Sequence, residues 1–308
     1  MKNLFKIIGK RLILLIPVLI GISILVFTIM DMAPGDAAQN ILGQNASQEE
    51  VAELREELGL NRPFLTRYFD YMKGVLSGNL GTSWSTHLPV LDEIAARLPT
   101  TIGLTIGSTL IMVIIGVPVG IISAVKKYSV IDCIFLVLAF IMTAMPSFWI
   151  GLILMLTLGL KLHWFPTIGA ETWKHFVLPC IALSSVQMAA IIRMTRSTML
   201  EVMNQDYIRT ARAKGASEGR IVFRHALRNT MMPVTTLIGL RIGSCMGGTL
   251  IIESVFGMPG FGSLIINAVR IKNVPVVMGG ILYIAIVIGI VNLAIDIIYT
   301  FIDPRVRV

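Results

Sequence analysis

The segment Met194–Gly215, MTRSTMLEVMNQDYIRTARAKG, is the longest basic and polar stretch of an otherwise apolar chain. It continues into Ala216–Arg228, ASEGRIVFRHALR, and apolar runs long enough to cross a membrane lie on both sides of it. From Arg193 to Arg228 the chain carries eight of its 26 Lys and Arg residues, against three acidic residues. Because Lys and Arg are disfavoured on the translocated side of a membrane, we expect this segment to lie in the cytoplasm.

The same segment, which we term the elbow (residues 194–228), has the sequence pattern of two short helices joined by a turn. Asn204 can cap a first helix that runs to Lys214, and Gly215 can end that helix in a left-handed conformation. Ser217 can cap a second helix that leads into the next apolar run. We therefore expect a rigid helical projection on the cytoplasmic side.

The first elbow helix has an apolar face surrounded by charge. Tyr207 and Ala211 are four residues apart and share a face, with Ile208 beside them, so the pattern predicts an apolar knob. Basic residues flank the knob and suit acidic groups on a partner: Arg209, Arg212 and Lys214. A positively charged helix lying on anionic lipid is the alternative interpretation.

Composition places most of the chain in a lipid bilayer. It is 55% hydrophobic and only 14% charged, and a soluble domain cannot bury that much apolar surface. Six stretches are long and apolar enough to cross a hydrocarbon layer of about 30 Å. They are approximately Leu12–Met30, Thr101–Val125, Cys133–Leu160, Phe176–Ile192, Thr230–Ile252 and Pro275–Phe301. The predicted fold class is an all-α integral membrane protein with six transmembrane helices.

The distribution of positive charge predicts the orientation. With six spans, 16 Lys and Arg residues fall on the side of the elbow and both termini, and nine fall on the other side. The positive-inside rule then places both termini in the cytoplasm. The net charge of +8 reflects this topology and gives no reason to expect nucleic acid as a partner.

The segment between the first two spans is long enough to form a small helical domain outside the membrane. Ser47 and Glu50 match a capping box, Gly59 can close the helix that follows, and Pro63 can start another. Ten acidic and five basic residues give the segment an acidic surface, either a solvated cap or a docking face for an external partner. The predicted domains are residues 1–30, the cytoplasmic N-terminus and first span; 31–98, the extracytoplasmic domain; and 99–308, a five-helix core with the elbow.

Small residues and a proline predict how the spans pack. Gly116 and Gly120 are four residues apart, as are Gly239 and Gly243, and this spacing lets another helix approach closely. Pro146 is expected to kink the third span.

Arg241 is the most unusual residue within a span. It lies 12 residues beyond Asn229, about 18 Å along the helix and near the bilayer centre. A charge there is costly, so it should line a water-filled translocation path or pair with an acid, for which Asp296 is the candidate.

A glycine-rich segment, Glu253–Gly262 (ESVFGMPGFG), lies just outside the fifth span. A tight re-entrant turn is tolerated there only if protein covers it or it lines a cavity. The candidate outer gate comprises Phe256, Met258, Pro259 and Phe261. An ordinary surface turn is the alternative.

No catalytic motif accompanies these features. The four histidines are scattered through flanks and loops, and the three cysteines lie in apolar runs without the spacing of a metal site. We expect no catalytic residue, no metal site and no cofactor bound by the chain itself.

The elbow resembles the cytoplasmic loop of permease subunits of binding-protein-dependent ABC importers, and most closely that of the dipeptide, oligopeptide and nickel permease family. Matching pieces occur in order along nearly the whole chain: Pro34–Asp36 (PGD), Gly78–Ser83 (GNLGTS), His225–Asn229 (HALRN), Pro259–Gly262 (PGFG) and Asp303–Arg305 (DPR). The broader permease pattern is Glu-Ala-Ala, three residues and then Gly, which reads here Arg209, Thr210 and Ala211 before Gly215. Since the glutamate is missing, any role given to it in other permeases is not transferred.

The resemblance implies an ABC importer permease fold in which the elbow holds the coupling helix that seats in a groove of an ATPase subunit. The matching residues are Asp206, Tyr207, Ile208, Arg209, Thr210, Ala211, Arg212, Lys214 and Gly215. It also implies partners: a homologous second permease, two cytoplasmic ATPase subunits that hold ATP and Mg²⁺, and an extracytoplasmic substrate-binding protein. The membrane would be the cell (inner) membrane of a bacterium or archaeon.

The implied function is ATP-driven import of dipeptides or oligopeptides by alternating access, with this chain forming half of the pore. A nickel- or metal-chelate importer is an alternative, because the binding protein does most of the selecting. An autonomous secondary transporter or channel is the alternative from another class, and it would work without an ATPase. An intramembrane enzyme would need a catalytic cluster that the sequence lacks.

Overall fold

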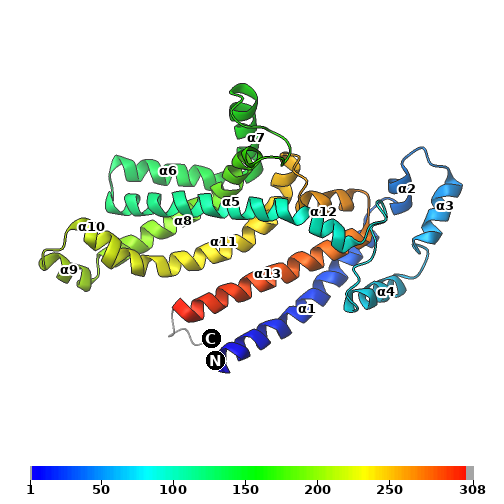
Figure 1. The fold of residues 1–308 in the computed structure, drawn as a ribbon, viewed down its shortest axis with the longest axis horizontal. Coiled ribbons are helices and arrows are strands. Elements are labelled where there is room, and N and C mark those ends of the chain that lie inside the picture. The colour runs from blue at the N-terminus through cyan, green and yellow to red at the C-terminus, as the bar shows by residue number, and fades with distance from the viewer. Residues whose placement is uncertain (1, 303–308) are drawn as a thin grey trace. The chain divides into compact units, whose positions relative to one another are not determined.

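The computed structural model describes residues 2–302, and every secondary-structure element in that range is a helix (Figure 1). The side chains of residues 2–7, 10, 12, 244, 246–248 and 295–302 lie outside what it describes. The chain forms two compact units. The first comprises the chain up to Thr101 together with Pro259–Leu293, and the second is built on Ile102–Met258.

The first unit combines long apolar helices with a set of short ones. It contains α1 (Lys2–Met32), α2 (Ala37–Leu42), α3 (Gln48–Glu57), α4 (Phe64–Leu76), the start of α5 (Val90–Val125), α12 (Phe261–Arg270) and most of α13 (Val274–Ile302). Phe27 of α1, Tyr68 of α4 and Met278 of α13 form a buried cluster. Tyr68 and Ser23 also share a buried hydrogen bond between their hydroxyl oxygens, which are 2.8 Å apart. The short helices are thus fastened to the C-terminal part of α1.

The predicted capping box of α3 is confirmed. The backbone N–H of Glu50 donates to Ser47 Oγ at 3.2 Å, and the backbone N–H of Ser47 donates to Glu50 Oε2 at 2.7 Å. The hydrogen bond from the Ser47 backbone N–H is the main reason that the pKa of Glu50 lies below its ordinary value, and the Ser47 hydroxyl contributes as well. Gly59 follows the helix with φ +65°, the left-handed conformation predicted for its end.

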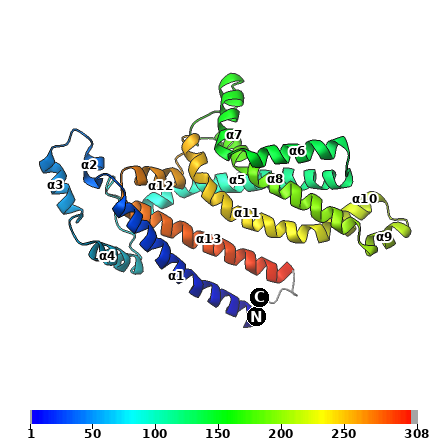
Figure 2. The same cartoon turned by 180° about the vertical axis from the view of Figure 1, so that it is seen from behind.

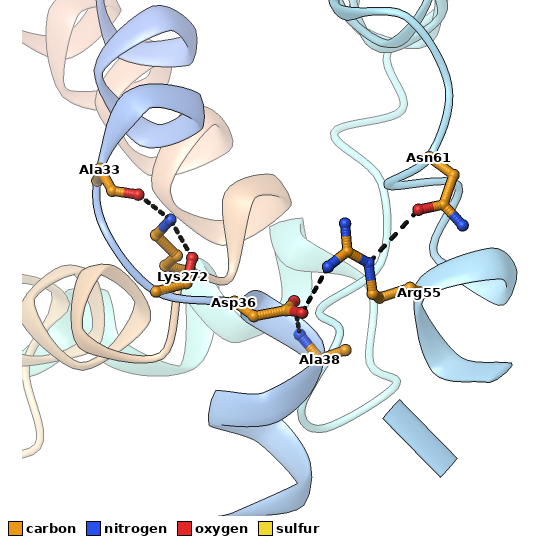
Figure 3. A network of polar contacts seen from close by, with 7 residues as sticks. Ala33, Asp36, Ala38, Arg55, Asn61 and Lys272 are labelled. Atoms are coloured by element: carbon orange, nitrogen blue, oxygen red, sulfur yellow. Dashed lines mark hydrogen bonds and ion pairs between the residues drawn. The ribbon is translucent and has the colours of Figure 1, made fainter. Parts of the chain in front are cut away.

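The turn between α12 and α13 holds both ends of the segment that contains the short helices, and Figure 3 shows the contacts of Lys272 at the first of these ends. Lys272, buried and with φ +58°, donates from Nζ to the carbonyl oxygens of Ala33 and Gly35. Asn273, 1% exposed, accepts from the Trp84 backbone N–H and donates to the hydroxyls of Ser83 and Ser85. A single turn therefore ties the exit from α1 to the approach to α5.

A second set of polar contacts continues from this turn (Figure 3). The Asp36 carboxylate caps α2 by accepting from the Ala38 backbone N–H at 3.0 Å and pairs with Arg55 of α3 at 2.8 Å. Arg55 also donates to Asn61 at 3.4 Å. These contacts join α2, α3 and the loop that follows.

The second unit is organised around α8. Its elements are the rest of α5, α6 (Val130–Ala144), α7 (Ser147–Leu154) with a π-helical turn at Met155–Lys161, α8 (Trp173–Met203), α9 (Asp206–Ala213), α10 (Glu218–Arg220), a π-helical turn at Ile221–Ala226, and α11 (Leu227–Val255). The helix α8 packs against α6, α7 and α11, and it lies between α6 and α11 in both views (Figures 1 and 2).

Close helix packing at the predicted glycines of α5 is confirmed. A Cβ atom added at Gly116 would lie 3.2 Å from Ile191, and one at Gly120 would lie 2.6 Å from Thr195, both on α8. Gly243 of α11 instead has no described atom within 4 Å of an added Cβ. Among the described residues, none therefore packs closely on α11 at Gly243.

The third predicted span, Cys133–Leu160, is not one kinked helix, which corrects the sequence-based expectation. The pair α6 and α7 is bent by 105° at Met145–Pro146. Pro146 has no N–H to donate, and its ring disfavours the helical conformation of the preceding residue. Met145 accordingly has extended backbone angles, φ −97° and ψ 134°.

Length and composition identify several helices that can cross a membrane. They are Ile13–Met32 of α1, all of α5, all of α8 and Val274–Ala294 of α13, and the bent pair gives a fifth candidate. The predicted span Thr230–Ile252 lies in α11, part of whose side chains falls outside the described residues. The chain is thus a multi-pass helical membrane protein, while the count of six spans stays a prediction.

Candidate coupling and translocation sites

The elbow forms the two predicted helices, α9 and α10, with one difference at its start. Asn204 does not cap the first helix, because α8 continues to Met203 and Asn204 ends it; Gln205 precedes α9. Gly215 has φ +83° and closes the turn after α9 as predicted. Ser217 stands at the start of α10 but makes no side-chain capping bond.

Ile208 does not belong to an exposed knob, which corrects the predicted face of α9. Its side chain is 0% exposed and packs in a cluster with Met199 and Val202 of α8 and with Ile221 and Val222. A fully buried isoleucine is worth about 1.5–3 kcal/mol relative to an exposed one. Ile208 therefore seats α9 on its own chain instead of contacting a partner.

The outward face of α9 is polar and charged. Its exposed members are Asp206, Tyr207, Arg209, Thr210, Arg212 and Ala213, and Ala211 is half-buried. Lys214, which follows the helix directly, is exposed as well. The Tyr207 hydroxyl accepts from Asn229 Nδ2 at 2.7 Å, so this ring is held in one position although it is 43% exposed. Arg209 is largely exposed and lies 3.5 Å from Asp206. The face offers an aromatic ring and basic groups to a partner.

Arg212 differs from its neighbours because it is already paired. Its guanidinium donates from Nε and a terminal nitrogen to the two oxygens of Glu218, at 2.7 and 3.1 Å. This hydrogen bond lowers the pKa of Glu218 and raises the pKa of Arg212. The pair bridges α9 and α10 across Gly215, so Arg212 stiffens the elbow.

An ion pair that the sequence analysis did not identify anchors the stem of the elbow. Asp132 at the start of α6 is 3% exposed and accepts from Arg196 of α8 at 2.7 and 2.8 Å. The same carboxylate accepts from Ser123 Oγ at 2.5 Å and from the Tyr128 backbone N–H at 2.9 Å. Each oxygen thus has two donors, which satisfies the buried charge. The turn from α5 to α6 is thereby fixed to the part of α8 that begins the elbow.

Arg241 lies in α11 and is neither fully buried nor fully exposed. Its Nε atom is buried and makes no hydrogen bond to any described residue. Asp296, the candidate partner, lies outside the described side chains, so the predicted pair remains a prediction. Cys245, one turn further along α11, is fully buried, which places the two residues on the same side of this helix.

The four candidate gate residues are divided between the two units. Phe256 and Met258 are 1% exposed and belong to the apolar cluster of the second unit. The Phe256 carbonyl accepts from the Gly169 backbone N–H at 3.2 Å. Pro259 and Phe261 belong to the first unit, where the Phe261 backbone N–H donates to Thr101 Oγ1 at 2.9 Å. The aromatic and methionine side chains of this segment are covered by protein, whereas Pro259 is exposed.

Side chains of the kinds that ligate metals are scattered over the described part of the chain. Among those residues, no three His, Cys, Asp or Glu side chains lie together as a metal site requires. The described cysteines, Cys133, Cys180 and Cys245, are all free thiols.

The fold is that of a multi-pass helical membrane protein with a polar elbow, and comparison with known families identifies its class as the membrane permeases. Residues 116–308 match the family model for binding-protein-dependent transport system inner membrane components. Residues 4–105 match the model for the N-terminal part of such membrane components. The chain belongs to this family of ABC importer permeases.

The curated relatives are similar over nearly their whole length. The dipeptide transport system permease protein of Alkalihalophilus pseudofirmus is 41% identical, with 97% of this chain and 98% of the relative covered. The oligopeptide transport system permease protein of Bacillus subtilis is also 41% identical, with the same coverage. The glutathione transport system permease protein of Escherichia coli O6:H1 is 39% identical, with 97% of each chain covered.

Solved structures support the fold. A chain from an inward-facing structure of the MetNI methionine ABC transporter superposes with a TM-score of 0.58 at 18% identity. The superposition covers 68% of this chain and 96% of that one. At this identity the likeness concerns the fold alone.

Proposed function

We propose that this chain is one of two permease subunits of an ATP-driven importer of peptides and forms half of its translocation pore. The observation that carries the proposal is the elbow. In a chain of the binding-protein-dependent family, a short helix is seated on a buried cluster and presents a polar face outward. The proposed topology has six spans, both termini in the cytoplasm, and residues 31–98 outside.

The elbow suits a coupling role because it transmits force without bending. In the proposed mechanism, the exposed face of α9 seats in a groove of an ATPase subunit. Motion of that subunit would pass through buried Ile208 into the end of α8, and through the Arg212–Glu218 bridge into α10. The Asp132–Arg196 pair then carries it to α5 and α6. A loop without these anchors would absorb the motion instead.

The remaining subunits follow from this assignment. A homologous second permease would complete the pore, and α11 at Gly243, where no described residue packs closely, is a surface where another helix can approach. Two cytoplasmic ATPase subunits would hold ATP and Mg²⁺, which this chain is not expected to bind. A substrate-binding protein on the outer side would deliver the solute, and the candidate gate and Arg241 would lie along its path.

Peptides are the proposed substrate class because of the curated relatives. Their names specify dipeptide, oligopeptide and glutathione transport, and glutathione is itself a tripeptide. A nickel- or metal-chelate importer is the alternative substrate assignment within the same architecture.

The test is ATP hydrolysis by the complete complex, purified with both permeases, both ATPases and the binding protein. We expect binding protein loaded with a dipeptide to raise the ATPase rate. Stimulation by nickel chelate alone would overturn the substrate class. Absence of any bound ATPase subunit would overturn the importer assignment.

Coupling is tested in the same complex with changes in the elbow. Ala211→Asp puts a charge on the half-buried face of α9, and Gly215→Pro cannot adopt the positive φ of the turn. Both should abolish peptide uptake while leaving the permease inserted, whereas Gly219→Ala, at a helical glycine with open space around it, should not. Full uptake by the two elbow variants would contradict a coupling role for α9.

A further inference from the structure

A groove of about 550 Å³ lies within the first unit, between the start of α5 and α12. Its α5 wall presents Asp92, Glu93 and Arg97, and its α12 wall presents Ser263 and Asn267. The rest of the lining is largely apolar and includes leucine, isoleucine, valine and alanine side chains. The groove thus combines both signs of charge with hydrogen-bonding groups and apolar surface.

The charged side chains of the α5 wall do not form ion pairs with one another. Glu93 and Arg97 are four residues apart, a spacing and order that favour an ion pair on a helix surface. No ion pair joins them, and Glu93 instead accepts from the Thr86 hydroxyl. Among the described residues, the side chains of Asp92, Arg97 and Asn267 have no hydrogen-bond or ion-pair partner. Opposite charges therefore face the groove with capacity to bind.

The two walls are held in place by close contacts to α13. A Cβ atom at Gly279 would lie 2.7 Å from Val90, the first residue of α5, and one at Gly280 would lie 2.0 Å from Ile265 of α12. The hydrogen bond from the Phe261 backbone N–H to Thr101 Oγ1 also joins the start of α12 to α5. Because the walls are fixed, little ordering is needed when a ligand binds.

We propose that this groove binds a short zwitterionic peptide. The peptide ammonium would lie at Asp92 and Glu93, its carboxylate at Arg97, and its amide group within reach of Asn267. Two extended residues span about 7 Å, and residues four apart on a helix have Cβ atoms about 5–6 Å apart, so the charges match a dipeptide in spacing. The proposal rests on the proposed peptide importer and adds to it a binding site at the outer end of α5.

This site makes a prediction about substrate chemistry that the rest of the fold does not make. A peptide whose amino terminus is acetylated leaves Asp92 and Glu93 without a cation. One whose carboxyl terminus is amidated leaves Arg97 without an anion. A site built for both charges discriminates against each analogue.

The experiment measures protection of a cysteine placed in the groove. In the complete complex, Cys133→Ser removes the exposed native thiol, and Ala96→Cys adds one at an exposed groove position. The rate of its modification by a membrane-impermeant maleimide is measured with alanylalanine, N-acetyl-alanylalanine and alanylalaninamide. We expect alanylalanine to slow the modification and both analogues to protect at clearly higher concentrations.

A charge variant gives a second readout. Arg97→Gln should raise the half-protective concentration of alanylalanine by up to about fivefold, the value of a partly exposed ion pair, and should leave that of alanylalaninamide unchanged. Arg270→Gln, at an exposed arginine at the end of α12 and outside the groove, is the matched control and should change neither. The analogue comparison needs no charge variant, so it remains decisive if Arg97→Gln does not assemble.

The outcomes separate this inference from the proposed function. Equal protection by all three compounds, or none by any, with normal ATPase stimulation by peptide-loaded binding protein would overturn the groove site alone. Protection by peptide-free binding protein equal to that by alanylalanine would assign the groove to docking of that protein and would also overturn it. Loss of ATPase stimulation would count against the importer, while protection by alanylalanine would still support the site.

Discussion

Replacing Asp132 by Asn should loosen the stem of the elbow without disturbing the rest of the fold. The change removes the negative charge that Arg196 faces at 2.7 and 2.8 Å while preserving the size of the side chain. It also converts one acceptor oxygen into a donor, so either Ser123 or the Tyr128 backbone N–H loses its partner. Arg196, only 18% exposed, is left as a poorly compensated charge.

The magnitude follows from burial. Removing one partner of a buried ion pair costs about 3–5 kcal/mol, and we take the lower end, about 3 kcal/mol, because the Arg196 side chain retains some exposure. An opening free energy reduced by about 3 kcal/mol corresponds to amide exchange faster by about two orders of magnitude. The effect should be concentrated in the turn between α5 and α6, where Tyr128 has φ +62° and depends on Asp132 for its N–H partner.

Hydrogen exchange followed by mass spectrometry on peptides that cover residues 120–135 is the assay. The matched control is Asp70→Asn, since Asp70 pairs with Arg62 at 2.8 Å but both side chains are 55% exposed. An exposed pair contributes about 1 kcal/mol or less, so exchange near residue 70 should rise by no more than about fivefold. An Asp132→Asn effect no larger than that of Asp70→Asn would refute the argument that burial makes this pair an anchor.

Three further predictions concern the elbow and the turn between α12 and α13. Gly215→Ala should cost about 1 kcal/mol because of the positive φ, giving several-fold faster exchange in the elbow, whereas Gly219→Ala should not; equal effects would contradict the turn geometry. Glu218→Gln should speed exchange of the elbow at neutral pH. The pKa of Glu218 is lowered from its ordinary value of 4.5, so the pair is present above that pH and is lost as the pH falls through the folded pKa. Wild type and variant should therefore converge in acid, and a constant difference would argue against the pair. Asn273→Ala leaves the Trp84 N–H without its partner and should cost about 1–3 kcal/mol, read as faster proteolysis within residues 31–98; Asn61→Ala, which removes one exposed hydrogen bond, should have little effect.

Features set by neighbouring residues could be predicted from the sequence. The capping box at Ser47 and Glu50, the left-handed turn at Gly215 and the long apolar helices all follow from local patterns. The close approach at Gly116 and Gly120 was predictable for the same reason, because spacing on one helix decides it.

Features that depend on distant residues could not be predicted. Asp132 and Arg196 are 64 positions apart, and Lys272 reaches carbonyls more than 230 positions away. Nothing in a local pattern brings such groups together. From the sequence, Asp132 could be recognised only as an acidic residue at the start of an apolar helix.

Two errors in the sequence analysis have a common physical cause. Ile208 is next to Tyr207 in the sequence, and the helical pattern of α9 alone does not show whether it faces outward. It is buried because the π-helical turn at Ile221–Ala226 and the end of α8 pack against it. Pro146 predicted a kink, but an extended Met145 turned it into a 105° break. In both cases the local pattern was interpreted correctly, but tertiary packing determined which side chain is buried and how far the helix bends.

The candidate site was only partly predictable. The exposed members of α9 and the position of the elbow follow from charge and helix signals. The groove between α5 and α12 does not, since its walls come from segments about 170 residues apart, which meet through their packing on α13 and the hydrogen bond from Phe261 to Thr101.

Uptake of labelled dipeptide into proteoliposomes is the measurement that tests the central claim most directly. Vesicles that contain the complete complex and binding protein should accumulate the dipeptide only when ATP is supplied on the side of the ATPase subunits, and vesicles with this chain alone should not. Accumulation by this chain alone, driven by an ion gradient and indifferent to ATP, would contradict the account and assign the chain to the autonomous transporters.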